Sequence, residues 1–130
     1  MTDRESFIRY PATSPAAARR YVQSVLLAFD RAEAVEDAIL LVSELVTNVL
    51  VHTGSEHASI GVIATETGIR IEVDDHSPAP PVREKHPDLS VPGGLGLGIV
   101  EDVSARWGVL QHPDNGKTVW FELELELATG

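Results

Sequence analysis

The sequence contains no cysteine and no long hydrophobic segment. The absence of cysteine excludes disulfides and thiolate metal sites. No apolar run approaches the ~18 residues that a membrane-spanning helix needs, and the polar residues 2–5 are not typical of a signal peptide. We therefore expect a cytoplasmic protein that does not associate with membranes.

Basic residues are also scarce. Ten Lys and Arg oppose twenty Asp and Glu, for a net charge of −10, and the basic residues are scattered along the chain. Because nucleic-acid surfaces need clustered cations, no direct binding to nucleic acid is expected. An acidic protein can still bind a nucleotide where a metal ion and local N–H donors offset the phosphate charge. None of the five histidines has metal-ligand spacing, so no zinc site is expected.

The chain length indicates one domain, residues 1–130, with room for a hydrophobic core. Residues 121–127 alternate strictly, which predicts a strand with one buried face and one face of carboxylates. The order of elements favours an α+β fold, a two-layer sandwich with a mixed, mostly antiparallel sheet and helices on one face. Ser14 and Pro15 predict a helix start, with proline at the first helical position. The periodicity predicts helices over 15–29, about 34–51 and 99 to about 106; strands over 6–10, 58–65, 69–74, 108–112 and 118–127; and a long loop over 77–92.

A glycine-rich run at 92–100 leads into an apolar, helix-compatible segment. The unpaired N–H groups and the dipole of a helix N-terminus favour phosphate. The spacing excludes two familiar phosphate sites. Ile99 or Glu101 stands where the dinucleotide fingerprint needs its third glycine, and Ile99 stands where a P-loop needs lysine. At this point an ordinary surface turn remains an equal alternative.

The second predicted helix carries a narrow polar stripe on an otherwise apolar segment. Ser43, Glu44, Thr47 and Asn48 fall within an arc of roughly 140°. A solvent face is one explanation, although such faces usually carry several charged side chains. Glu44 and Asn48 are neighbours on one face, where a carboxylate can serve as a general base and an Asn carbonyl as a Mg²⁺ ligand. His52, one turn further on, either continues this site or caps the helix.

Four segments in this order resemble the ATP-binding domain of the GHKL superfamily: ELVTN at 44–48, VDDHSP at 73–78, GLGLGIV at 94–100 and GKTVWF at 116–121. The resemblance runs from about residue 9 to 127 and is closest to the anti-sigma-factor serine/threonine kinase branch. It implies a Bergerat-type ATP-binding fold with a lid over about 76–96, and it implies ATP and Mg²⁺ as cofactors.

The resemblance also implies roles for individual residues. Glu44 matches the catalytic carboxylate, Asn48 the Mg²⁺ ligand, and Asp75 the acceptor of the adenine amino group, a role for which Asp74 competes. Ser77 and Ala79 stand where the family pattern has glycines. The remaining nucleotide-binding residues implied are the loop residues Gly94, Leu95, Gly96, Leu97 and Gly98, and Thr118 near the adenine pocket.

The function expected from this resemblance is an ATP-dependent protein serine/threonine kinase of the anti-sigma factor type. Such a kinase phosphorylates an anti-anti-sigma partner, regulates a sigma factor by partner switching, and commonly forms a homodimer. The alternative is a non-catalytic module that sequesters a protein with weak or no nucleotide binding. An ATPase of DNA topology or repair fits less well, because we expect a single domain without a transducer domain and because the acidic charge does not suit binding to a duplex.

Overall fold

The computed structural model describes residues 9–52, 55–75, 96–113 and 116–126. Its helical elements are α1 (Pro15–Ala28), the 3₁₀ turn η2 (Ala32–Ala34), α2 (Val35–Thr47), the π-helical turn η3 (Asn48–His52) and α3 (Gly96–Val103). Its strands are β1 (Tyr10–Ala12), β2 (Ala58–Ala64), β3 (Gly68–Asp75), β4 (Arg106–Gln111) and β5 (Lys117–Glu124).

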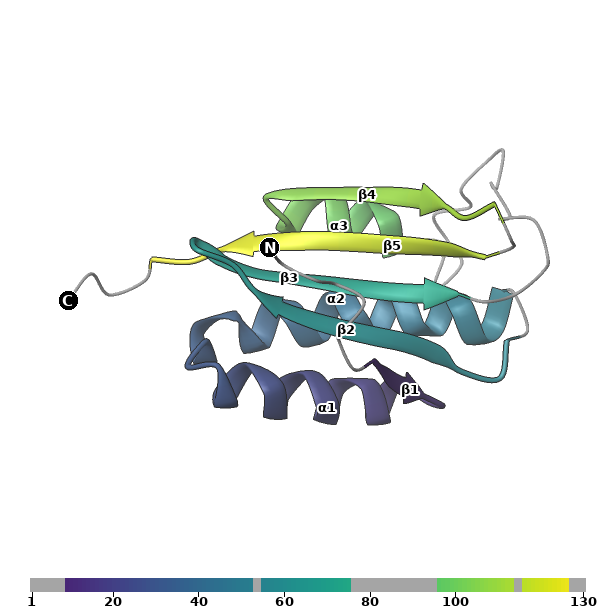
Figure 1. Cartoon of the computed structure of the whole chain (residues 1–130), viewed down its shortest axis with the longest axis horizontal. Helices are drawn as coiled ribbons and strands as arrows, with labels where there is room; N and C mark the ends of the chain where they lie inside the picture. The colour runs from purple at the N-terminus through teal and green to yellow at the C-terminus, as the bar shows by residue number, and fades with distance from the viewer. Residues whose placement is uncertain (1–8, 53–54, 76–95, 114–115, 127–130) are drawn as a thin grey trace.

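The strands form one sheet in the order β1-β2-β3-β5-β4. Figure 1 shows α1, α2 and α3 together on one side of this sheet. The predicted α+β sandwich with helices on one face is therefore confirmed. Every pairing between the described strands is antiparallel, so the sheet that the sequence predicts as mostly antiparallel is antiparallel throughout its described part.

The predicted start of the first helix is confirmed by its cap. The Ser14 hydroxyl accepts a hydrogen bond from the Ala17 N–H at 3.0 Å, and proline occupies the first turn, where its missing N–H costs nothing. The helix then buries Ala18, Val22 and Leu26 at intervals of four residues, so one stripe packs on the sheet.

The core lies between the helices and one face of the sheet. Alternate residues of β3, from Ile69 through Ile71 to Val73, are buried on this face, and β5 places Phe121 opposite Ile71. The predicted alternation of the last strand is thus confirmed where the structure describes it, with Phe121 and Leu123 buried and with Glu122 and Glu124 on the other face.

Two element boundaries differ from prediction because of local hydrogen bonds. Helix α3 ends at Val103 rather than near 106, since the Ala105 N–H bonds to the Glu122 carbonyl (2.8 Å) and so joins the sheet. Strand β5 ends at Glu124, because the Leu125 N–H bonds instead to the Thr67 carbonyl in the β2–β3 turn (2.8 Å).

Two further boundaries differ at the first strand and the second helix. β1 spans Tyr10–Ala12 rather than 6–10, and residues 6–8 lie outside the described residues. The helix predicted over 34–51 is α-helical only to Thr47, after which the chain continues as the π-helical turn.

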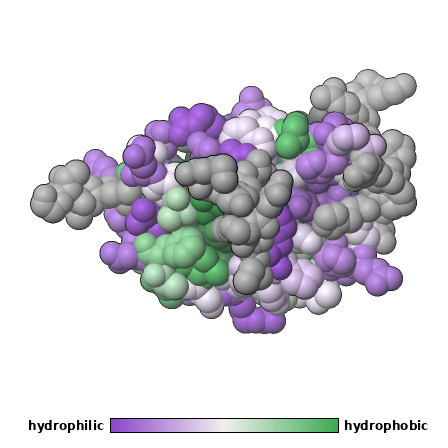
Figure 2. All heavy atoms as spheres, viewed as in Figure 1, coloured by the Kyte–Doolittle hydropathy of each residue, from purple (hydrophilic) through white to green (hydrophobic). Residues whose placement is uncertain are grey.

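The face of the sheet without helices carries buried charge. Glu72 is fully buried and accepts hydrogen bonds from Arg9 and Arg70, each at 2.9 Å. Arg9 also lies 3.3 Å from Asp74. Figure 2, viewed from this side, shows hydrophilic side chains over much of the surface, with a large apolar patch at the lower left and a smaller one at the top. These arginines offset the cost of burying carboxylates.

The same network continues across β5. Arg70 lies over the Trp120 ring, 4.1 Å from its centroid, and bonds to Glu122 at 3.1 Å. Arg106 bonds to Glu122 and to Glu124, both at 2.8 Å. Burial raises the pKa of Glu122, but the hydrogen bonds and charges of Arg106 and Arg70 outweigh it together, so the pKa lies below the ordinary value.

We expect Glu122→Gln to remove a pH-dependent part of the stability. A carboxyl whose folded-state pKa is depressed stabilises the fold fully above its unfolded pKa of 4.5, and this contribution is lost as pH falls through the folded pKa. The free energy of unfolding of the variant, measured with urea, should therefore be about 0.5–1 kcal/mol lower than that of the wild type near neutral pH and equal to it in strong acid. Glu101→Gln, at an exposed carboxylate on α3, is the control and should show no such pH dependence.

We also expect Gly68→Ala to destabilise the fold. A Cβ at residue 68 would lie 1.9 Å from the Leu123 carbonyl oxygen, so backbone would have to move, at a cost of about 1–3 kcal/mol. Gly98→Ala is the matched control, because nothing lies within 4 Å of its Cβ position and alanine is the better helix former. Equal unfolding midpoints for the two variants would contradict this packing.

Candidate functional site

One end of the sandwich gathers most of the described residues that the sequence singles out. The C-terminal end of α2, the end of β3, the start of α3 and the start of β5 lie at the same end of the molecule, on the right in Figure 1. Helix α2 packs against both β3 and α3. Loops and element ends positioned by a rigid scaffold are where binding residues concentrate.

Asn48 stands where α2 gives way to the π-helical turn, a feature frequent at functional sites. Its N–H bonds to the carbonyls of Glu44 and Leu45, so the backbone is fixed by the helix. Its side-chain oxygen Oδ1 is buried and has no hydrogen-bond partner among the described residues. A buried oxygen left without a donor is costly, and a carboxamide oxygen is a ligand that Mg²⁺ accepts. The residue therefore fits a Mg²⁺ site.

The predicted polar stripe on α2 divides into two parts. The Ser43 hydroxyl accepts from Arg19 of α1 at 2.9 Å, and the Thr47 hydroxyl donates to the Ser43 carbonyl at 2.8 Å. These hydroxyls thus make bonds within the helical layer. Glu44 and Asn48 are only partly exposed and form no side-chain hydrogen bond within the described ranges.

Asp75 is 2 % exposed and lies on the helix-covered face, in the alternation that buries Val73. Its Oδ1 accepts from the Ser55 hydroxyl at 2.9 Å, and its Oδ2 accepts from the Lys117 ammonium at 3.0 Å. Asp74, its competitor, lies on the opposite face beside Arg9. Of the two carboxylates, Asp75 is therefore the one that shares a face with α2.

Thr118 does not lie with Asp75. It is opposite Asp74 in the β3–β5 register and donates a hydrogen bond to the Asp74 carboxylate, on the face without helices. His112 also contacts its hydroxyl, at 2.7 Å. The β5 residue that shares the face of Asp75 is the preceding one, Lys117. Sequence reasoning missed Lys117 and Ser55, and the signal for Lys117 is the strand alternation that puts it on the same face as Val119 and Phe121.

The predicted glycine loop is described only in part. Gly94, Leu95 and residues 76–93 of the predicted lid lie outside the described residues. Gly96 begins α3, with Leu97 following in its first turn, and Gly98 has open space around its Cβ position. The start of α3 therefore offers helical N–H groups at the same end as Asn48 and Asp75.

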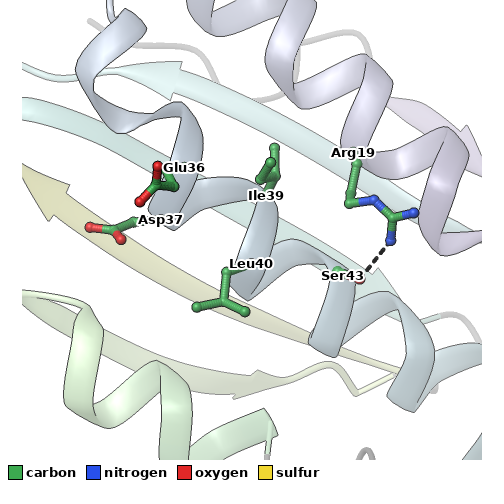
Figure 3. Close-up of a pocket in the computed structure, with 6 residues that line it drawn as sticks. All are labelled: Arg19, Glu36, Asp37, Ile39, Leu40 and Ser43. Atoms are coloured by element: carbon green, nitrogen blue, oxygen red, sulfur yellow. Dashed lines mark hydrogen bonds between the residues drawn. The ribbon is translucent and has the colours of Figure 1, made fainter.

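A separate hollow of about 390 Å³ lies between α1 and α2. Figure 3 shows Arg19 reaching across to Ser43 along it, with Leu40 and Ile39 nearby. None of the residues predicted to bind nucleotide lines this hollow. Its lining consists of Arg19, Glu36, Asp37, Ile39, Leu40 and Ser43.

Comparison with protein families gives one finding for this chain. The family model described as Histidine kinase-like ATPase domain matches residues 11–123, which span β1 to the penultimate residue of β5. Comparison with curated proteins gives no match. In the described part of the chain, no helix is long and apolar enough to cross a membrane.

We expect Asn48→Leu to leave the ligand-free protein as stable as before, or more stable. The change removes a buried oxygen that has no donor and installs a better helix former, for a gain of up to about 1 kcal/mol. Residues kept for function rather than stability behave in this way. The measurement is the free energy of unfolding without nucleotide or Mg²⁺, and a loss above about 1 kcal/mol would show that Asn48 is needed for the fold itself.

Proposed function

The chain belongs to the histidine kinase-like ATPase family, and from this membership we propose that it binds ATP with Mg²⁺ and phosphorylates a protein partner. The observation that carries the proposal is the buried Asn48 oxygen without a partner in the described structure, one helical turn after Glu44. The geometry supports a nucleotide between the end of α2, the end of β3 and the start of α3.

Asn48 would hold the metal. Mg²⁺ usually takes one or two protein oxygens and completes its shell with phosphate oxygens and water. Bound there, it would neutralise charge on the phosphates. Asn48 Oδ1 suits this role because its backbone is fixed by two hydrogen bonds and its oxygen is desolvated.

Asp75 would bind the base. A buried carboxylate at a strand end is a fixed acceptor for the exocyclic amino group of adenine. The strand pairs on both sides of β3 and the hydrogen bond from Ser55 hold it in place. Fixing an acceptor before the ligand arrives reduces the entropic cost of binding.

The start of α3 would face the phosphates. Its first-turn N–H groups favour anions, and the open space at Gly98 lets a phosphate group approach closely. Phosphoryl transfer depends mainly on positioning and charge stabilisation. The helix donors, together with a metal ion that Asn48 would hold, would supply both.

Glu44 would act on the acceptor hydroxyl. It lies one turn before Asn48 on the same side of α2, and its carboxylate makes no hydrogen bond to any described residue. A carboxylate in this position orients a serine or threonine hydroxyl and takes its proton. The resemblance to the anti-sigma factor branch supports an anti-anti-sigma protein as the substrate and a sigma factor as the second partner.

One observation favours a second candidate function, a non-catalytic module that sequesters a protein. Both oxygens of Asp75 already accept hydrogen bonds from the chain's own side chains, Ser55 and Lys117. A base must share or displace these bonds, which would weaken nucleotide binding. Ser77 and Ala79, in place of the family's glycines, support the same alternative.

We expect Glu44→Gln to bind ATP as the wild type does but to transfer phosphate roughly 10²- to 10⁴-fold more slowly, because only the proton acceptor is lost. Asn48→Ala should weaken ATP binding in Mg²⁺ and remove its dependence on Mg²⁺. Calorimetry measures binding, and transfer from radiolabelled ATP to a panel of anti-anti-sigma proteins measures activity.

The control variant is Glu33→Gln, which changes an exposed carboxylate in η2. It should match the wild type in both assays. Wild-type transfer rates in Glu44→Gln would refute the assigned role of Glu44. No binding at millimolar ATP with Mg²⁺ would favour the sequestering module.

A further inference from the structure

Lys117 is a cation that lies directly beside Asp75 in the candidate base site. It stands directly opposite Asp75 in the β3–β5 register and points to the same, helix-covered face. Its ammonium lies 3.0 Å from Asp75 Oδ2, and its side chain is only 18 % exposed. A lysine held this deeply is costly unless its donors are used.

The ammonium has donors to spare. It carries three N–H groups, and within the described residues the interaction with Asp75 is the one it makes. A carboxylate presents about four lone-pair positions and so accepts from several donors at once, and Asp75 accepts from Ser55 and Lys117 among its contacts. Asp75 and Lys117 therefore place a hydrogen-bond acceptor and a hydrogen-bond donor side by side.

Resting on the ATP site proposed above, we infer that Lys117 reads the nucleobase together with Asp75. Adenine presents an amino donor next to the ring acceptor N1. The Asp75 carboxylate accepts from the amino group, and the Lys117 ammonium donates to N1. Lys117 is thus a specificity-determining residue for adenine, and it relieves the competition for Asp75 because its ammonium gains a new acceptor when the base arrives.

A purely structural role for Lys117 makes a different prediction. If it only neutralises Asp75, its removal weakens every nucleotide alike. If it donates to N1, its removal abolishes discrimination against a base that lacks N1. Comparing ATP with an analogue in which a C–H group replaces N1 separates the two roles, since the analogue keeps the amino group, ribose and phosphates.

The experiment measures the dissociation constants of ATP and of this analogue in Mg²⁺ by calorimetry. We expect the wild type to bind the analogue roughly ten- to hundredfold more weakly than ATP, as is usual for a lost hydrogen bond to a charged group. Lys117→Met should bind both equally, with an affinity near that of the wild type for the analogue. Arg20→Met, which removes one exposed positive charge from α1, should discriminate as the wild type does.

Equal binding of ATP and the analogue by the wild type would overturn the inference without any variant, and so would undiminished discrimination by Lys117→Met. Both results leave ATP binding itself intact. Failure of the wild type to bind either nucleotide would instead overturn the proposed function, and the inference with it.

Discussion

The antiparallel pairing of β3 with β5 sets Asp75 opposite Lys117 and Asp74 opposite Thr118. Because successive side chains of a strand point to opposite faces, this single register sends the first pair under the helices and the second pair to the other side. The apolar residues of both strands, such as Ile71 opposite Phe121, hold the register by burial. A slip of one residue would exchange the faces and bring Asp74, rather than Asp75, under the helices.

Carboxylates are buried on both faces, but their partners differ in kind. Glu72 is held by the guanidinium groups of Arg9 and Arg70, planar forks that fix a carboxylate in one geometry. Asp75 is held by a serine hydroxyl and by a lysine ammonium. The lysine's three donors rotate, and its side chain is flexible. The first arrangement suits a permanent part of the fold, and the second suits a place where a ligand is to be admitted.

The sequence predicts those features of the site that depend on neighbouring residues, and it does not predict those that depend on residues far apart in the chain. Helical period alone puts Glu44 and Asn48 on one side of α2, and strand alternation alone predicts the buried faces. Neither says that Lys117 stands opposite Asp75, because that depends on the pairing of strands more than forty residues apart in sequence. The early end of α3 has the same cause, a hydrogen bond from Ala105 to β5.

The two ends of the sandwich differ in how completely their polar groups are paired. At the end of the β2–β3 turn, Arg31 donates to the carbonyls of Gly68 and Thr65, and the Gly68 N–H donates to the Thr65 hydroxyl. At the opposite end, the helix widens into a π turn and Asn48 Oδ1 is buried without a donor in the described structure. A buried oxygen without a donor destabilises the fold, and it persists where the rest of the structure is stable enough to compensate. The end with the β2–β3 turn and the apolar core thus stabilise the fold. The opposite end carries polar groups, such as Asn48 Oδ1, to which a nucleotide and its metal ion would bind.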